Sequence, residues 1–298
     1  MATINAAHVG TFVSRRAFQA FVDTLAPLSA FATDFRDQIA GPGDTVNVPV
    51  YDANTGTQDF VDYEDTPAGA TSNIQVVIDK HKVNNIVLSD VQIANSSAAN
   101  MADFAIQAGA DLAKTVFQDI LSVVTIANYA NTELASLASA FDTDDVIDLK
   151  NTCDGANMPN ARRSLVLDTG HFNALLKDTA IKSDASYGTD TGIRQGMIPS
   201  LVGFTPVYSS TGVPANGAEN IVGFATTPSA VAVAMRYLNP ARPEKYDRVQ
   251  RLVDPGTGIV IGMREHYQEV TGNLYVSLEA NYGYAVGQST ALTRVVSS

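Results

Sequence analysis

Two Asp-Thr-Gly triplets, which begin at Asp168 and Asp190, are the residues of this chain that most suggest chemistry. Aspartic proteases use two carboxylates that share one proton, each held in such a turn. Here the triplets are only 22 residues apart (168 to 190), too close to come from the two lobes of such an enzyme. They are followed by His171 and Ile193, not by the Ser or Ala of that family. We therefore interpret Asp168 and Thr169 as capping a helix at Gly170, and Asp190 as a turn residue.

The other groups that could support catalysis are scattered. No two of the four histidines (His8, His81, His171 and His266) have metal-ligand spacing with each other or with Cys153. The sequence contains no phosphate-binding Gly-x-x-x-x-Gly-Lys-Ser/Thr loop and no Gly-x-Ser-x-Gly nucleophile turn. We expect no catalytic residue, cofactor or metal, and Cys153 to be an inert small side chain. A hydrolase on an α+β scaffold stays open as an alternative without an identifiable site.

Charge and composition exclude several classes of protein. The chain has 298 residues and a net charge of −12, from 31 acidic and 19 basic residues. A sequence-specific nucleic-acid binder normally carries a basic face, so this chain as a whole would be repelled by DNA or RNA. A single cysteine excludes an intrachain disulfide. The N-terminal residues do not resemble a signal peptide, and no apolar run approaches the roughly 18 residues of a membrane span. We expect synthesis and folding in a reducing cytoplasm.

The elements that would position any site change character along the chain. In residues 1–43, apolar side chains recur at helical spacing from Phe18 to Phe35, which predicts a helix. Pro27 lies within this run and interrupts the helix. This segment is either an ordinary amphipathic core helix or an arm that docks on a neighbouring subunit. From Asp44 the period becomes two, and alternating runs at 46–50 and 74–78 predict a long hairpin. The intervening residues are mostly polar and have too little apolar surface to fold back on their own core.

Residues 100–127 give the strongest prediction of a helix, about 40 Å long. Its apolar face runs from Met101 to Val124, and Gly109 is the only glycine within it. A mixed region follows. We expect strands at 164–167, 205–209, 229–235, 259–267 and 274–280, a helix at 170–177, and a glycine-rich loop at 188–196. The predicted class is α+β, with no internal repeat.

Several phrases, in this order, resemble the Hong Kong 97-type major capsid proteins of tailed bacteriophages. Gly43-Asp-Thr-Val-Asn-Val-Pro49 is similar to the entry of that family's extended loop, and Ile78–Ser97 to the strand and short helix that lead to its spine helix. Arg162–Asp178 resembles the strand and helix that open the axial domain, and Ser200–Pro214 its central hairpin. Tyr282-Gly283-Tyr284 resembles the final strand of the peripheral domain.

The resemblance implies a capsid fold divided as follows: N-terminal arm, 1–43; extended β-hairpin loop, 44–80; peripheral domain with the spine helix, 81–155; axial domain, 156–252; and return strands to the peripheral domain, 253–298. Such subunits self-assemble into pentamers and hexamers that close into an icosahedral head shell around double-stranded DNA. The implied location is the virion, after assembly in the host cytoplasm. The nearest rival is an encapsulin-type shell protein of a bacterial nanocompartment, which has the same fold.

The resemblance also implies partners. They are further copies of the chain, a portal protein, decoration proteins, and packaged DNA bound without sequence specificity; no membrane is involved. Many family members carry an N-terminal scaffolding segment of about a hundred residues. Because the arm begins close to Met1 here, we expect a separate scaffolding protein.

Charge patterning suggests where subunits meet. Six acidic residues and no Lys or Arg lie between Val46 and Asp79, whereas residues 236–251 have five basic and two acidic residues. We expect the acidic hairpin of one subunit to lie over the basic segment of its neighbour. The candidate contact residues are Asp59, Asp62, Glu64 and Asp65 on the hairpin and Arg242, Lys245, Arg248 and Arg251 on the basic segment.

Overall fold

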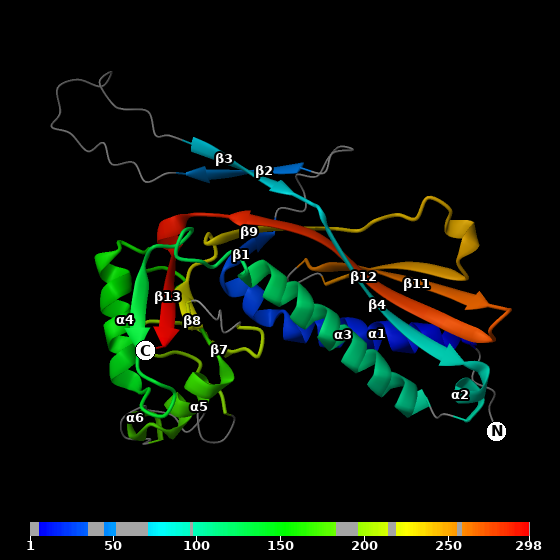
Figure 1. Cartoon of the computed structure of the whole chain (residues 1–298), viewed down its shortest axis with the longest axis horizontal. Helices are drawn as coiled ribbons and strands as arrows, with labels where there is room; N and C mark the ends of the chain where they lie inside the picture. Colours follow the sequence, from blue (N-terminus) through cyan, green and yellow to red (C-terminus); the bar gives the residue numbers. More distant parts are fainter. Residues whose placement is uncertain are drawn as a thin grey trace.

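The computed structural model describes residues 6–34, 45–51, 71–95, 98–182, 196–213, 219–254 and 258–297. Two β-sheets with their helices lie toward opposite ends of an elongated molecule, and a two-stranded ribbon lies beside them (Figure 1). This combination of sheets and separate helices confirms the predicted α+β class.

The first sheet packs on two long helices, α1 (Ala6–Thr24) and α3 (Ala98–Leu121), which run side by side (Figure 1). A methyl group at Gly109 of α3 would lie 2.1 Å from the carbonyl oxygen of Ala17, so only glycine allows this crossing. Pro27 is the second residue of a short 3-10 helix, η1 (Ala26–Ala30), where the sequence predicted a break. Helix α1 packs on α3 of the same chain, and an arm that docks on a neighbouring subunit stays a prediction.

Helix α3 is shorter than predicted. It ends at Leu121, six residues before the expected end at 127. The Ser122 hydroxyl donates a hydrogen bond to the Asp119 carbonyl, and the Asn128 amide donates one to the Val123 carbonyl. These side chains satisfy backbone carbonyls that a further turn of helix would have used. The apolar periodicity extends to Val124 because that residue is buried in the turn after the helix.

The first sheet has six strands in the order β1-β9-β12-β11-β10, with β4 on β12 as well. Their bounds are β1 (Ala32–Asp34), β4 (Lys80–Ser89), β9 (Val231–Arg236), β10 (Arg248–Val253), β11 (Val260–Gln268) and β12 (Asn273–Val286). A short helix, α2 (Asp90–Asn95), leads from β4 toward α3, in the order that the resemblance implied. A 3-10 turn, η3 (Pro243–Lys245), lies between β9 and β10.

The second sheet has five strands in the order β5-β13-β8-β6-β7. They are β5 (Thr132–Ala135), β6 (Ser164–Leu167), β7 (Val207–Ser209), β8 (Ile221–Thr226) and β13 (Leu292–Ser297). Its helices are α4 (Thr143–Gly155), α5 (Thr169–Lys177) and α6 (Thr179–Lys182), and a 3-10 turn, η4 (Ser289–Ala291), precedes β13. The expected central hairpin is reduced to two isolated antiparallel bridges, Ile198 with Val207 and Leu201 with Phe204.

The ribbon consists of β2 (Thr45–Tyr51) and β3 (Thr71–Val77), which pair antiparallel as the alternating pattern predicted. Val46, Val48, Val76 and Ile78 bury one face of it against Ala232 and Ala234 of β9. The base of the predicted hairpin is therefore anchored on the first sheet.

The expected domain boundaries at residues 155 and 252 stay a prediction. Each sheet takes strands from both sides of these positions. Strands β9 and β10, from the expected axial segment, belong to the first sheet. Within 253–298, β11 and β12 belong to the first sheet and β13 pairs with β5 and β8 in the second, a difference that the sequence pattern does not predict. The physical reason is that β13 is buried on both faces, so it lacks the alternation that would assign it to a sheet.

Candidate functional site

The four acidic candidates of the hairpin, Asp59, Asp62, Glu64 and Asp65, lie outside the described residues. The base of the hairpin is described, and its position is tightly constrained. A methyl group at Gly283 of β12 would lie 2.0 Å from the carbonyl oxygen of Val77 and 2.9 Å from Cα of Ile78. The ribbon thus leaves the sheet in direct backbone contact with β12. On its other side, Val77 is 48% exposed.

The four basic candidates differ in orientation. Arg242 and Lys245 are exposed at η3, in the connection between β9 and β10. Arg251 is exposed on β10, three residues after Arg248, so the two side chains point to opposite faces of the sheet. Arg248 pairs in register with Glu265 on the face that carries Ile86, Met263 and Val276, which belong to the core. Arg242, Lys245 and Arg251 are therefore exposed, whereas the Arg248 side chain lies on the core face of the sheet.

Glu265 is an unusual member of this inner face. It is buried, and one of its carboxylate oxygens, Oε2, has no hydrogen-bond partner in the described structure. Burial raises the pKa of Glu265, and the nearby positive charge of Arg248 offsets only part of this effect. Oε1 of Gln250, two residues after Arg248 on the same face, is also buried and unpaired in the described structure. The site therefore favours the neutral form of the Glu265 carboxyl group more than water does.

A second carboxylate, Glu279 of β12, organises the outer face. Arg264 Nε lies 2.9 Å from Glu279 Oε1, and His81 Nε2 lies 3.2 Å from Glu279 Oε2. Arg264 also donates hydrogen bonds to the Tyr246 hydroxyl and the Leu238 carbonyl. A methyl group at Gly262 would lie 2.6 Å from Glu279 Oε1, so this glycine makes room for the carboxylate. The cluster links β4, β11 and β12 to the connection between β9 and β10, in which Leu238 and Tyr246 lie.

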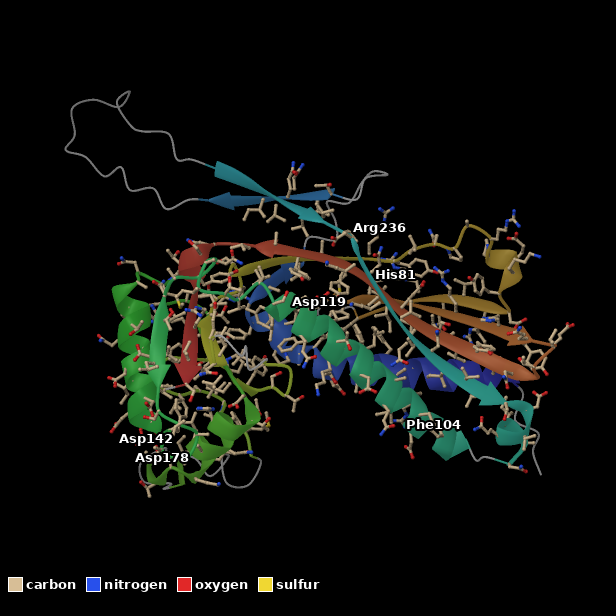
Figure 2. The ribbon with its side chains drawn as sticks, in the orientation of Figure 1. His81, Phe104, Asp119, Asp142, Asp178 and Arg236 are labelled. Carbon is tan, nitrogen blue, oxygen red and sulfur yellow. The ribbon has the colours of Figure 1, made fainter. Side chains whose placement is uncertain are left out.

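His81 stands where the ribbon joins the sheet. Figure 2 shows it beside Arg236, near the end of the β2–β3 ribbon, and both residues pair in register with Asn281 of β12. His81, Arg264 and Glu279 were not among the predicted contact residues. The available signal was Glu279 itself, a charged residue in a run of alternating apolar residues, which needs a partner if it is buried.

An aromatic row follows on the same outer face. The rings of His266 and Tyr275 are stacked with centroids 5.0 Å apart, and Tyr246 meets His266 edge-on at 6.1 Å. Val87 of β4, 46% exposed, continues this row because it pairs in register with Tyr275. Next to the outward cations, this row forms a partly apolar, partly basic surface suited to contact with a protein.

The residues that suggested chemistry have structural roles. Asp168 caps α5 by accepting a hydrogen bond from the His171 backbone N–H at 2.8 Å, as predicted, and it also contacts His171 Nδ1. Asp190 lies outside the described residues. Cys153 is buried, which raises the pKa of its thiol and keeps it protonated. In the described ranges, no group of three or more His, Cys, Asp or Glu residues could hold a metal ion. None of the described helices is long and apolar enough to cross a membrane.

Comparison with known proteins identifies the family. The sequence model of the phage capsid protein family matches residues 70–286, which include β3, β4, α3 and β12. The chain has no match among curated proteins.

Solved structures share the fold at low identity. The chain is similar to one in the structure of Mycobacterium phage Che8, with 18% identity, a TM-score of 0.54, and 91% of this chain and 90% of that chain covered. The capsid structure of cyanophage P-SCSP1u gives 15% identity and a TM-score of 0.57, with 90% and 86% covered. The virus-like particle from Pyrococcus furiosus gives 11% identity and a TM-score of 0.50, with 95% and 97% covered. With the family match over most of its length, the chain belongs to the phage capsid protein family and has the Hong Kong 97-type capsid fold.

Proposed function

We propose that this protein is the major capsid protein of a tailed bacteriophage, and that it self-assembles through pentamers and hexamers into the icosahedral head shell. The observation that carries the proposal is the family match over residues 70–286, from the return strand of the ribbon to the end of β12. The order of ribbon, short helix, long helix and second sheet supports it, because this is the order that the resemblance to the family implied.

The partners follow from the same proposal. The shell encloses double-stranded DNA without sequence specificity, which agrees with a net charge of −12: a basic lumen would hinder packing and release of the genome. A portal protein occupies one vertex, a separate scaffolding protein guides assembly in the host cytoplasm, and decoration proteins bind the outside. The role is structural, and we propose that the chain has no enzymatic activity.

Contacts between subunits join opposite charges. The acidic stretch with Asp59, Asp62, Glu64 and Asp65 lies over a neighbour's Arg242, Lys245 and Arg251, which point outward. Exposed ion pairs contribute only about 0–1 kcal/mol each, so their effect depends on repetition around the shell. Arg248 contributes less to this contact, because it faces Glu265.

An encapsulin-type compartment is the second candidate, with less support, because the family match is to phage capsid proteins. The fold alone does not separate the two functions, whereas the contents of the particle do. A phage head contains DNA, and an encapsulin contains a cargo protein. The α+β hydrolase alternative has no set of described residues to support it.

The test is assembly of the purified protein. We expect pentamers, hexamers or closed shells in negative-stain images at high concentration and near-physiological salt, or aggregation when scaffolding is absent. A sharp monomer peak in sedimentation under these conditions would overturn the proposal. Particles purified from infected cells should contain nuclease-protected DNA; particles that contain a cargo protein instead would favour the encapsulin function.

A further inference from the structure

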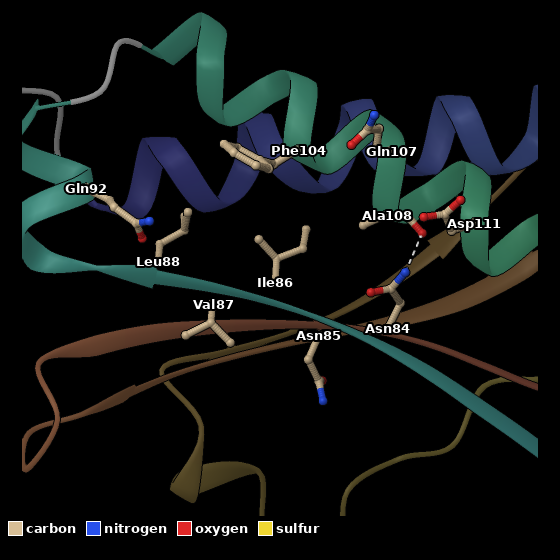
Figure 3. Close-up of a pocket in the computed structure, with 10 residues that line it drawn as sticks. All are labelled: Asn84, Asn85, Ile86, Val87, Leu88, Gln92, Phe104, Gln107, Ala108 and Asp111. Carbon is tan, nitrogen blue, oxygen red and sulfur yellow. Dashed lines mark hydrogen bonds between the residues drawn. The ribbon is translucent and has the colours of Figure 1, made fainter.

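Strand β4 is an outer strand of the first sheet. It pairs with β12 over its whole length, and no other described strand pairs with its second edge. Beside that edge, a groove of about 430 Å³ separates β4 from α3 (Figure 3). Phe104 of α3 lines the groove and is 58% exposed. The backbone N–H and C=O groups of this edge are thus available to another strand.

The residues of β4 do not protect this edge along its length. Exposed edge strands usually carry Lys, Pro or a bulge that prevents pairing with other chains. In β4, Lys80 and Lys82 stand only at the beginning, and residues 83–89 have no charge. The outer face of this uncharged part presents Val83, Asn85 and Val87, all exposed. Such an edge is suited to pairing with a partner strand.

The exposed outer face of β4 is self-complementary around Asn85, which points to a second copy of the chain as the partner. In an antiparallel pair centred on this residue, Asn85 lies opposite its own copy and Val83 lies opposite the second copy's Val87. The two valine pairs bury apolar side chains against each other on the outer face. On the inner face, Lys82 lies opposite the second copy's Leu88, which its aliphatic stem can cover while the ammonium group stays in water.

Other registers lose this match. A shift of the centre by one residue keeps each face of the strand opposite the same face of the second copy but changes every pair. With the centre at residue 86, Val83 lies opposite Ser89 and Asn85 opposite Val87. With the centre at residue 84, Val83 lies opposite Asn85 and His81 opposite Val87. Of these three registers, only the centre at Asn85 pairs valine with valine.

We infer that β4 of two copies of this chain pair antiparallel across a two-fold axis at Asn85, so that the first sheets of neighbouring subunits join into one continuous sheet. The inference rests on the proposed shell function, because an icosahedral shell contains two-fold relations between identical subunits, and a two-fold contact uses the same surface on both. The groove between β4 and α3 opens beside this edge, where the incoming strand would lie about 4.8 Å from β4.

The test is a disulfide across the proposed axis. In an Asn85→Cys variant, the two new thiols would lie opposite each other, at a Cβ separation of about 4.5–5.5 Å. This is close to the geometry of a disulfide. Because Cys153 is buried, it does not compete. We expect oxidised N85C shells to run mainly as covalent dimers in non-reducing gels and as monomers after reduction. Asn151→Cys, the same substitution at an exposed position of α4, is the control and should stay monomeric.

Each outcome bears on the inference separately from the function. N85C shells without covalent dimers would overturn the β4 pairing and leave the shell function intact. If the wild type forms no shell, the proposed function fails first. If only N85C fails to assemble, the Val83→Cys/Val87→Cys variant carries the test, because each cysteine then lies opposite the other one of the second copy. Covalent dimers of that variant support the register, and shells without them overturn it.

Discussion

Arg264 and Glu279 form a largely buried ion pair, with Nε and Oε1 2.9 Å apart, in a sheet that packs on helices through its other face. The two side chains are only 16% and 6% exposed. The pair connects β11 with β12, and His81 extends it to β4 at the base of the ribbon. One carboxylate therefore fixes three strands and the point at which the hairpin leaves the sheet.

Removal of the Glu279 charge should destabilise the subunit. In Glu279→Gln, Arg264 keeps its hydrogen bonds to the Tyr246 hydroxyl and the Leu238 carbonyl but loses its counter-charge in a site with little water. We expect the free energy of unfolding to fall by about 2–3 kcal/mol, which is less than for an isolated buried charge because these partners remain. Urea unfolding of the unassembled subunit measures it. Lys80→Met is the control: it breaks a pair with Asp79 that is mostly in water, and should change the midpoint little. Equal midpoints for Glu279→Gln and wild type would contradict the proposed role of the pair.

Glu265 should make the subunit less stable as pH rises. Its pKa in the folded state is raised above the ordinary value of 4.5, so the folded state binds more protons than the unfolded state just above that value. Stability from this group is complete below pH 4.5 and decreases as pH rises through the folded-state pKa. Glu265→Gln removes this dependence.

The comparison is a series of urea titrations of both proteins from pH 4 to pH 8. We expect the Gln variant to be more stable than the wild type near neutral pH, and the difference in stability between the two proteins to shrink toward pH 4. A wild-type protein that is the more stable of the two at neutral pH would show that the Arg248 charge outweighs burial.

Gly283 should tolerate no side chain. In Gly283→Ala, the new methyl group would meet the backbone of Val77 and Ile78, which can move only if the ribbon shifts on β12. We expect the free energy of unfolding to fall by about 1–3 kcal/mol, as it does when extra atoms are forced into a packed core. We also expect faster cleavage by protease within the segment between β2 and β3. Gly155→Ala makes the same chemical change at the end of α4, where no atom lies within 4 Å. It should leave stability unchanged or slightly raised, and a similar loss in both variants would argue against a specific contact at Gly283.

Local chemistry made much of this fold predictable. The face of α3 follows from apolar residues three and four apart, and the β2–β3 ribbon follows from strict alternation. The cap at Asp168 follows from a short polar side chain before a helical run. Each of these signals depends on residues close together in the sequence.

What was not predictable depends on pairing between distant residues. Arg248 and Arg251 look equivalent in the sequence, and only the register of β10 against β11 turns one toward Glu265 and the other outward. Likewise, Glu279, Arg264 and His81 come from three strands, so their spacing in the sequence does not predict that they are in contact. The place of β13 in the second sheet is settled by β8 and β5, more than 60 residues upstream.

Charge reversal on the hairpin should impair assembly without unfolding the subunit. The Glu64→Lys/Asp65→Lys variant would place two positive charges against a neighbour's Arg242 and Lys245. We expect fewer shells by sedimentation and an unchanged urea midpoint. Adding Arg242→Glu and Lys245→Glu to the same chain restores opposite charges and should recover assembly. Normal shells from the double reversal would refute the pairing, and failure of the fourfold variant to recover would assign these charges to different contacts.

The shell should be held together without covalent bonds between subunits. Some relatives of this fold join a lysine of the extended loop to an asparagine of a neighbour by an isopeptide bond, which requires a deprotonated amine as nucleophile. No lysine occurs between Val46 and Asp79, and the next two, Lys80 and Lys82, lie in β4, paired in register with Tyr282 and Ala280 of the same chain. These lysines are at the base of the ribbon, far along the chain from the hairpin tip. A disulfide is excluded for the wild type by the burial of Cys153. Mature particles boiled in detergent with reductant should therefore run as one band near 31.5 kDa. A ladder of multiples that survives this treatment would reveal a covalent bond formed by other residues, and mass spectrometry of the ladder would identify them.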